Sequence, residues 1–102
     1  MSTREGLRAR KLKREKIDLG EGLEIWVREL DARESSLIKI GSPASLMFSL
    51  GTTEEDGRRI YDPNDAADVA EIERLGARVI IPVNEAISRL SGASGKAETA
   101  KN

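Results

Sequence analysis

Between residues 16 and 30 the chain reads KIDLGEGLEIWVREL, and its apolar residues recur at every second position. This period of two lies on both sides of a short glycine-containing segment, residues 20–22, and therefore predicts a β-hairpin. Trp26 is expected on the opposite face of the hairpin from the core. Because a lone hairpin is not stable in water, helices must cover its core face. In the second strand that face would carry Leu23, Ile25 and Val27.

Two short helices are predicted after the hairpin. Asp31 and Glu34 have the spacing of a capping box, which predicts a helix that begins at Asp31 and ends before residues 41–43. Ser42 as the N-cap and Pro43 as the first helical residue predict a second helix. Gly51 can end it in the left-handed conformation. The apolar residues expected are Leu37, Ile38 and Ile40 on the first helix, and Leu46, Met47, Phe48 and Leu50 on the second.

Two more helices are predicted beyond a polar segment, in which residues 58–61 could form a short extended piece. Asp62 and Pro63 repeat the N-cap pattern, and Gly76 can end the helix that they begin. The last helix contains Pro82, which either kinks it or marks its first turn. The core stripes would be Val69, Ile72 and Leu75, then Val79 or Ile80 with Val83, Ile87 and Leu90.

These elements predict a small single domain of the α+β class, an N-terminal β-hairpin packed on three to four short helices. A chain of 102 residues has room for one such domain. We assign residues 16–91 to it. Residues 1–15 are interpreted as a basic, flexible arm, and residues 92–102, which lack apolar periodicity, as a disordered tail.

The net charge of −1 hides an asymmetry along the chain. Residues 1–16 carry seven Lys and Arg against two Glu, a balance of +5, so the rest of the chain sums to −6. A basic arm on an acidic body could contact nucleic acid or an acidic partner. The plainer interpretation is a solvated terminus, helical in part. Because the arm has no aromatic residue on which a base could stack, nucleic acid is not expected as a partner.

Several functional classes are excluded by composition. The chain has no Cys and no His, which removes thiolate and imidazole metal sites, disulfides and catalysis that needs an imidazole. The acidic segment 62–73 fits a calcium loop poorly, because Ala66 and Ala67 stand where an oxygen ligand and a glycine are needed. No apolar run approaches a membrane span, and no secretory signal is recognised. We expect no enzyme activity, no catalytic or metal-binding residue, no cofactor and no membrane.

Binding through apolar side chains remains as a functional class. Bulky and adaptable residues are few in this polar chain, and such residues can pack against varied partners. The alternative is that Met47 and Phe48 simply fill the small core, which is the more common role of such residues. The candidate protein-binding residues are Trp26, Met47, Phe48 and Leu50, with Ile60 and Tyr61 as second choices.

Three segments together resemble one family, the small tail assembly chaperones of long-tailed bacteriophages and prophages. Residues 16–30 are similar to the opening hairpin of these proteins, and residues 55–62, EDGRRIYD, to an acidic-glycine-basic-aromatic segment. Residues 83–92, VNEAISRLSG, are similar to their last helix. The resemblance covers about residues 16 to 92. The chain departs from the family's pattern at the break in residues 41–43 and at Pro82.

The resemblance implies a non-enzymatic chaperone that binds the tape measure protein and recruits major tail protein subunits during tail morphogenesis. It also implies a location in the host bacterial cytoplasm and absence from the mature virion. An amphipathic tape measure helix would be held by its apolar stripe in a groove. Self-association is left open. The alternatives are a structural head–tail or tail component that stays in the virion, and a small nucleic-acid-binding regulator that uses the basic arm.

Overall fold

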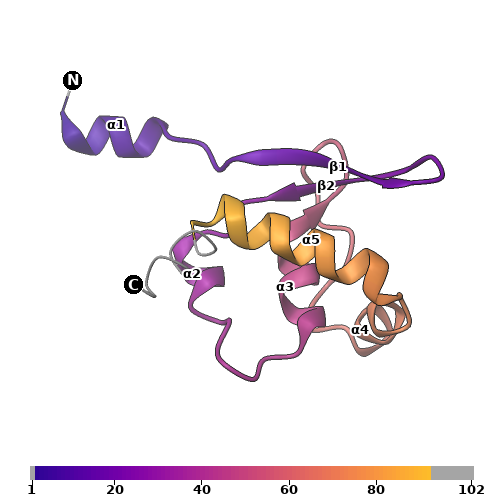
Figure 1. The fold of residues 1–102 in the computed structure, drawn as a ribbon. Coiled ribbons are helices and arrows are strands. Elements are labelled where there is room, and N and C mark those ends of the chain that lie inside the picture. The colour runs from indigo at the N-terminus through magenta and orange to yellow at the C-terminus, as the bar shows by residue number, and fades with distance from the viewer. Residues whose placement is uncertain (1, 93–102) are drawn as a thin grey trace, which may run out of the picture.

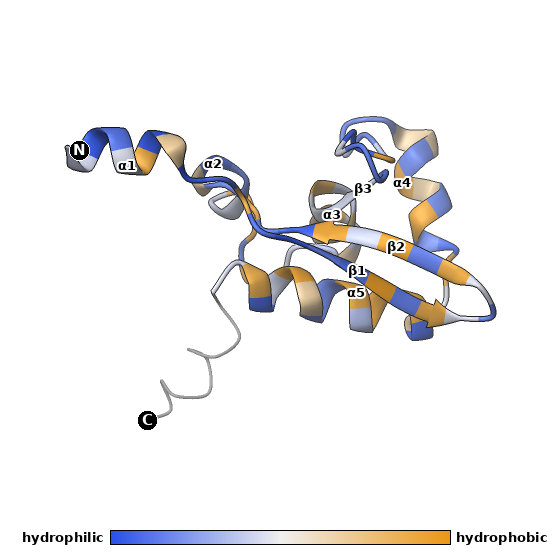
Figure 2. Cartoon of the chain, turned by 90° about the horizontal axis from the view of Figure 1, so that it is seen from above, coloured by the Kyte–Doolittle hydropathy of each residue, from blue (hydrophilic) through white to orange (hydrophobic). Residues whose placement is uncertain are grey.

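The computed structural model describes residues 2–92 (Figure 1). Three antiparallel strands form one sheet in the order β1-β2-β3, and helices α3 and α5 lie under the hairpin (Figure 2). The α+β class is confirmed. The strands are β1 (Arg14–Gly20), β2 (Leu23–Arg28) and β3 (Thr52–Thr53), and the helices are α1 (Thr3–Ala9), α2 (Ala32–Ser35), α3 (Ala44–Gly51), α4 (Ala66–Glu73) and α5 (Ala77–Leu90).

The predicted hairpin is present, with its turn where the sequence places it. Ile17 pairs with Ile25 across β1 and β2. Glu21 and Gly22 have φ values of 53° and 80°, the sign that a type I′ turn requires at both central positions. Val27 is fully buried, whereas Leu23 is 52% exposed because it stands at the turn end of the sheet, beyond the middle of the core.

The third strand is too short to give a sequence pattern. It consists of Thr52 and Thr53, which pair with Val27 and Trp26 of β2. The Thr52 hydroxyl donates to the carbonyl oxygen of Phe48 at 2.7 Å, so the chain passes directly from α3 into the sheet. The extended piece predicted over residues 58–61 is reduced to a single bridge between Arg59 and Thr53.

The first predicted helix is much shorter than expected. Helix α2 ends at Ser35, and Leu37 and Ile40 lie beyond it, 50% and 106% exposed. Serine side chains explain the early end, because they bond to nearby backbone groups in place of helical partners. The Ser36 hydroxyl donates to the Arg33 carbonyl at 2.8 Å, and the Ser42 hydroxyl accepts from the Lys39 amide at 2.9 Å.

Three other predicted helix boundaries are shifted. Pro43, not Ser42, is the N-cap of α3. Asp65, not Asp62, caps α4 by accepting from the amides of Ala67 and Asp68, while the Asp62 carboxylate accepts from the Asn64 amide in the preceding turn. Gly76 begins α5 and does not end α4, and Pro82 lies inside α5, beyond its first turn.

The core lies where α3, α4 and α5 meet the inner face of the sheet. Its residues come from both halves of the chain: Val27, Leu30, Phe48, Leu50, Ile72, Val83, Ala86 and Ile87. Gly51 permits the close approach of α3 and α5. A methyl group at its Cα would lie 2.5 Å from Cδ1 of Ile87, whereas the sequence suggested only a helix-ending role for this glycine.

We expect Gly51→Ala to destabilise the domain by about 1–3 kcal/mol, although alanine is intrinsically the better helix former. The cause is overpacking against the fully buried Ile87 side chain. Urea denaturation measures the change in the free energy of unfolding. Gly76→Ser is the control, because nothing lies within 4 Å of the added Cβ and serine is a favoured N-cap residue, and it should stay within about 0.5 kcal/mol of the wild type. Equal effects at both glycines would contradict the packing explanation.

A buried ion network joins β2, α2 and the segment after β3. The predicted capping box is confirmed, since the Asp31 carboxylate accepts from the Glu34 amide at 2.8 Å and Glu34 accepts from the Asp31 amide at 3.0 Å. Glu34 is only 8% exposed. Its carboxylate also accepts from Arg28 Nη1 and Arg59 Nη2, each at 2.8 Å, and Arg28 donates to the carbonyl of Leu50 at 2.9 Å.

This network makes stability depend on pH. Burial acts to raise the pKa of Glu34, but the hydrogen bonds from Arg28, the Asp31 cap and Arg59 outweigh it and lower the pKa from 4.5 to about 2. The stability that the carboxylate contributes is therefore present above pH 4.5 and lost as the pH falls towards 2. We expect a loss of about 3 kcal/mol over this range from this group, measured by urea denaturation. Glu34→Gln should flatten the curve, and an unchanged slope would contradict the assignment.

The N-terminal end of the described chain is more ordered than the predicted flexible arm. Residues 3–9 form the exposed helix α1, capped by Ser2 and Glu5, and the sheet begins at Arg14 instead of residue 16. The predicted disordered tail, apart from Gly92, lies outside the described residues.

Candidate protein-binding groove

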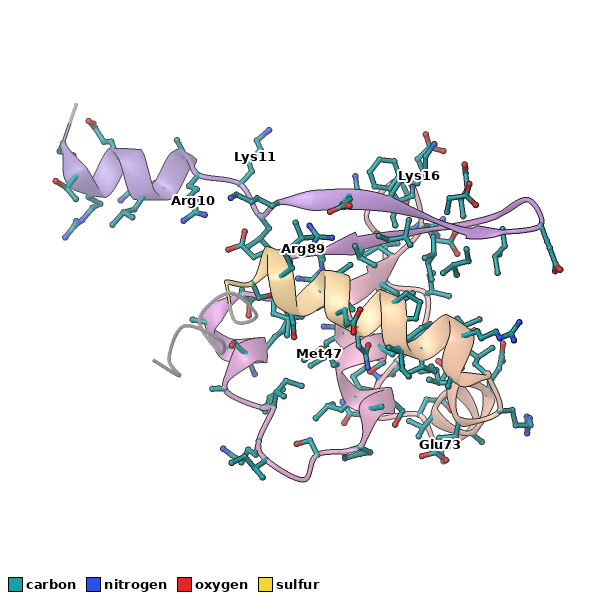
Figure 3. All side chains as sticks on the ribbon, viewed as in Figure 1. Arg10, Lys11, Lys16, Met47, Glu73 and Arg89 are labelled. Carbon is teal, nitrogen blue, oxygen red and sulfur yellow. The ribbon has the colours of Figure 1, made fainter. Side chains whose placement is uncertain are left out.

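The six candidate binding residues lie in different environments in the structure. Phe48 and Leu50 are 1% and 2% exposed, so they belong to the core and Leu50 offers no surface to a partner. Met47 is half-buried, and its sulfur accepts a hydrogen bond from Ser88 of α5 at 3.7 Å (Figure 3). Trp26 lies on the outer face of the sheet. Of the six, the structure brings together Phe48, Ile60 and Tyr61.

These three residues contribute to an open depression of about 280 Å³ between the turn end of the hairpin and the junction of α4 and α5. We call it the apolar groove. Phe48 forms part of its floor, and Ile60 and Tyr61 form one wall. Glu24 is the one charged residue that lines it. The remaining lining residues are Leu19, Leu23 and Ile25 of the hairpin, with Leu75 and Val79 beside Gly76.

Tyr61 is held in position from two sides. Its ring lies 6.2 Å from that of Phe48, tilted by 49°, and its hydroxyl donates to Glu71 of α4 at 3.2 Å. Burial and the hydrogen bond to the Glu71 carboxylate raise the pKa of Tyr61. The side chain is therefore a neutral, ordered part of the wall at physiological pH.

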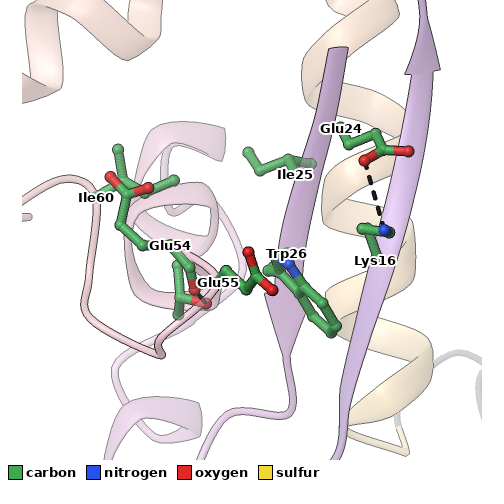
Figure 4. Close-up of a pocket in the computed structure, with 8 residues that line it drawn as sticks. Lys16, Glu24, Ile25, Trp26, Glu54, Glu55 and Ile60 are labelled. Atoms are coloured by element: carbon green, nitrogen blue, oxygen red, sulfur yellow. Dashed lines mark hydrogen bonds and ion pairs between the residues drawn. The ribbon is translucent and has the colours of Figure 1, made fainter. Parts of the chain in front are cut away.

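A second depression, the Trp26 groove, lies between β2 and the segment that follows β3 and has a volume of about 270 Å³ (Figure 4). It shares Glu24, Ile25 and Ile60 with the apolar groove. The Arg14 guanidinium lies 4.5 Å from the centroid of the Trp26 ring, a cation–π distance. Arg14 also donates to the carbonyls of Glu54 and Glu55 at 3.1 and 2.9 Å, which fixes the far wall of this groove.

The surroundings of the apolar groove are acidic. Ile60 and Tyr61 also line a third depression, with Arg59, Asp62 and Asp68. Counted together, five carboxylates line the three adjoining depressions, against the cations Lys16 and Arg59 in the lining and Arg14 over the Trp26 ring. Lys16 lies 3.5 Å from Glu24, and Arg59 is bonded to Glu34. We call the five carboxylates the acidic rim: Glu24, Glu54, Glu55, Asp62 and Asp68.

Sequence reasoning missed most of the apolar groove. Leu23, Leu75 and Val79 were expected only as core residues, and Leu23 is half exposed. The sequence does contain a signal for their exposure. Each of the three lies within three residues of a glycine at a chain reversal, where a side chain has fewer neighbours to pack against. Their convergence depends on the tertiary arrangement of the hairpin and the α4–α5 junction.

No group of three or more Asp, Glu, His or Cys side chains within residues 2–92 is placed to hold a metal ion. Nor does any helix in that range have the length and apolar character that crossing a bilayer requires. Comparison with protein-family models, curated proteins and solved structures gives no match.

Proposed function

We propose that this chain is a phage tail assembly chaperone that binds an amphipathic helix of the tape measure protein in its apolar groove and recruits major tail protein subunits. The observation that carries the proposal is the groove itself, an apolar depression whose walls come from the hairpin and from the α4–α5 junction. The resemblance of residues 16–30, 55–62 and 83–92 to this family supplies the class of partner.

The dimensions and charge of the groove favour a protein segment as its occupant. A volume of about 280 Å³ lies just below the range typical of pockets for small molecules and cofactors. It suits the anchoring side chains of a helix laid across it. Because the rim is acidic, the preferred helix carries Lys or Arg beside its apolar stripe. Many copies along one long helical protein would make weak individual binding sufficient.

The test is co-purification with segments of the tape measure protein encoded in the same genome. Leu23→Asp places a charge in the groove at a half-exposed position, so the fold should be retained. We expect capture to fall about tenfold or more, as for loss of an anchoring contact. Leu37→Asp is the matched control, since Leu37 is equally exposed but lies outside the groove, and capture should be unchanged.

Two results would contradict the proposal. The first is failure of the wild-type protein to retain any tape measure segment. The second is equal retention by Leu23→Asp and Leu37→Asp while circular dichroism is unchanged for both. Mass spectrometry of purified virions separates the alternative of a structural tail component, since abundant protein there would contradict a chaperone that departs before assembly ends.

A further inference from the structure

The N-terminal segment, residues 2–13, carries a mixed apolar and basic surface that its own domain does not cover. This segment is the part of the predicted arm that is described and precedes β1, and from here on the name arm refers to it alone. Helix α1 lies beyond the start of β1, on the side away from the hairpin turn (Figure 1), and it has no buried residue. Leu7 is 68% exposed and Leu12 is 41% exposed. Against the one acid Glu5, the arm has five cations: Arg4, Arg8, Arg10, Lys11 and Lys13. Of these, Arg10 lies 3.8 Å from Glu29 of its own domain.

The arm and the apolar groove are complementary in two independent respects. The arm has exposed leucines, and the groove has an apolar floor and walls open to solvent. The arm is strongly basic, and the rim of the groove is acidic, with carboxylates on both sides of Ile60. Opposite charges around an apolar contact both attract the partner and set its register.

The arm cannot reach the groove of its own chain in this fold. The Glu29 amide donates to the Lys13 carbonyl at 2.8 Å and the Lys13 amide donates to Glu29 Oε1 at 3.0 Å, so the chain enters β1 in a fixed direction. The groove lies at the other end of the hairpin, about 20 Å along the strand. The six residues from Lys13 back to Leu7 span at most about 20 Å when fully extended, which would require α1 to unwind.

We propose that the arm of one copy docks in the apolar groove of a second copy, with Leu7 as the apolar anchor and the basic side chains facing the acidic rim. In a reciprocal pair each copy supplies one arm and one groove, which closes a two-fold dimer. The groove is thereby covered until a stronger ligand displaces the arm. The association involves this chain alone, so it can be tested independently of tape measure binding.

The test is the molar mass in solution, measured by size-exclusion chromatography with light scattering over a dilution series. The wild type should form dimers that dissociate on dilution. Leu7→Asp in the arm and Leu23→Asp in the groove should each remain monomeric at every concentration, because each lacks one half of the contact. Ile81→Asp is the control. Ile81 is 55% exposed on α5 and lines neither groove, so this variant should dimerise as the wild type does.

A mixture of the two monomeric variants distinguishes this contact from others. Leu23→Asp keeps an intact arm and Leu7→Asp keeps an intact groove, so the mixture should regain one arm–groove contact and form heterodimers. Raising the salt concentration from about 0.05 M to about 0.5 M should weaken wild-type dimers about tenfold or more, through screening of the rim charges.

A monomeric wild type at the highest soluble concentration would overturn the proposal, as would dimers that persist in Leu7→Asp or a mixture that stays monomeric. Co-purification keeps the two proposals apart. Leu7→Asp should retain tape measure capture even though it no longer dimerises, whereas Leu23→Asp should lose both. If the basic arm binds nucleic acid in place of the groove, the purified wild type should stay monomeric, which also contradicts the proposal.

Discussion

Replacing Glu34 with alanine is expected to lower the free energy of unfolding by about 3–5 kcal/mol, because the substitution leaves a buried cation without its partner. The Arg28 side chain is only 15% exposed, and an arginine guanidinium stays charged at neutral pH even without its partner. The variant also loses the reciprocal half of the capping box with Asp31. Urea denaturation at neutral pH measures the loss.

Two further variants identify the source of that cost. Glu73→Ala removes an exposed carboxylate of α4 and should change stability by less than about 0.5 kcal/mol. Adding Arg28→Met to Glu34→Leu removes both buried charges and should recover much of the stability, since well-packed apolar residues can replace a buried ion pair. If the double variant is no better than Glu34→Ala, the stranded cation is not the main cost.

Phe48→Ala should destabilise the domain by about 3–5 kcal/mol, and Phe48→Asp should prevent folding altogether. Phe48 is 1% exposed and packs on the Tyr61 ring, so the aspartate would bury a charge without a partner. Circular dichroism and urea denaturation measure both changes. Leu37→Ala is the control, because Leu37 is half exposed and should lose less than about 0.5 kcal/mol. A folded Phe48→Asp protein would contradict the burial of this ring.

The sequence alone leaves two roles open for Phe48, a core residue or part of a binding face, and the structure decides between them. The segment 44–51 reads ASLMFSLG, in which every residue is apolar or small, so no polar face indicates which side of α3 meets the core. Phe48 was therefore a candidate for an exposed binding face as well as for the core. In the structure both Phe48 and Leu50 lie in the core, and only the edge of Phe48 reaches the apolar groove.

Local patterns were predictable where one short segment contains all the interacting groups. The hairpin around residues 20–22, the Asp31–Glu34 capping box and the buried stripe of α5 are of this kind. The length of α2 was not predictable, since serine side chains compete with its helical hydrogen bonds. Nor was the contact of Arg59 with Glu34, because 25 residues separate the two side chains. The apolar groove was missed for the same reason, as its walls come from distant segments.

The buried carboxylate of Glu34 also constrains how this sequence can diverge. Arg59 stands directly before Ile60 and Tyr61, so the ion network that stabilises the domain also anchors the groove wall. A change at position 28 or 34 therefore has to be matched at the other and also alters the partner of Arg59, while half-exposed Leu23 is free to follow the shape of a new partner. Related chains should keep the three ionic positions together and vary at the mouth of the groove. The domain could in this way acquire new partners without losing its architecture.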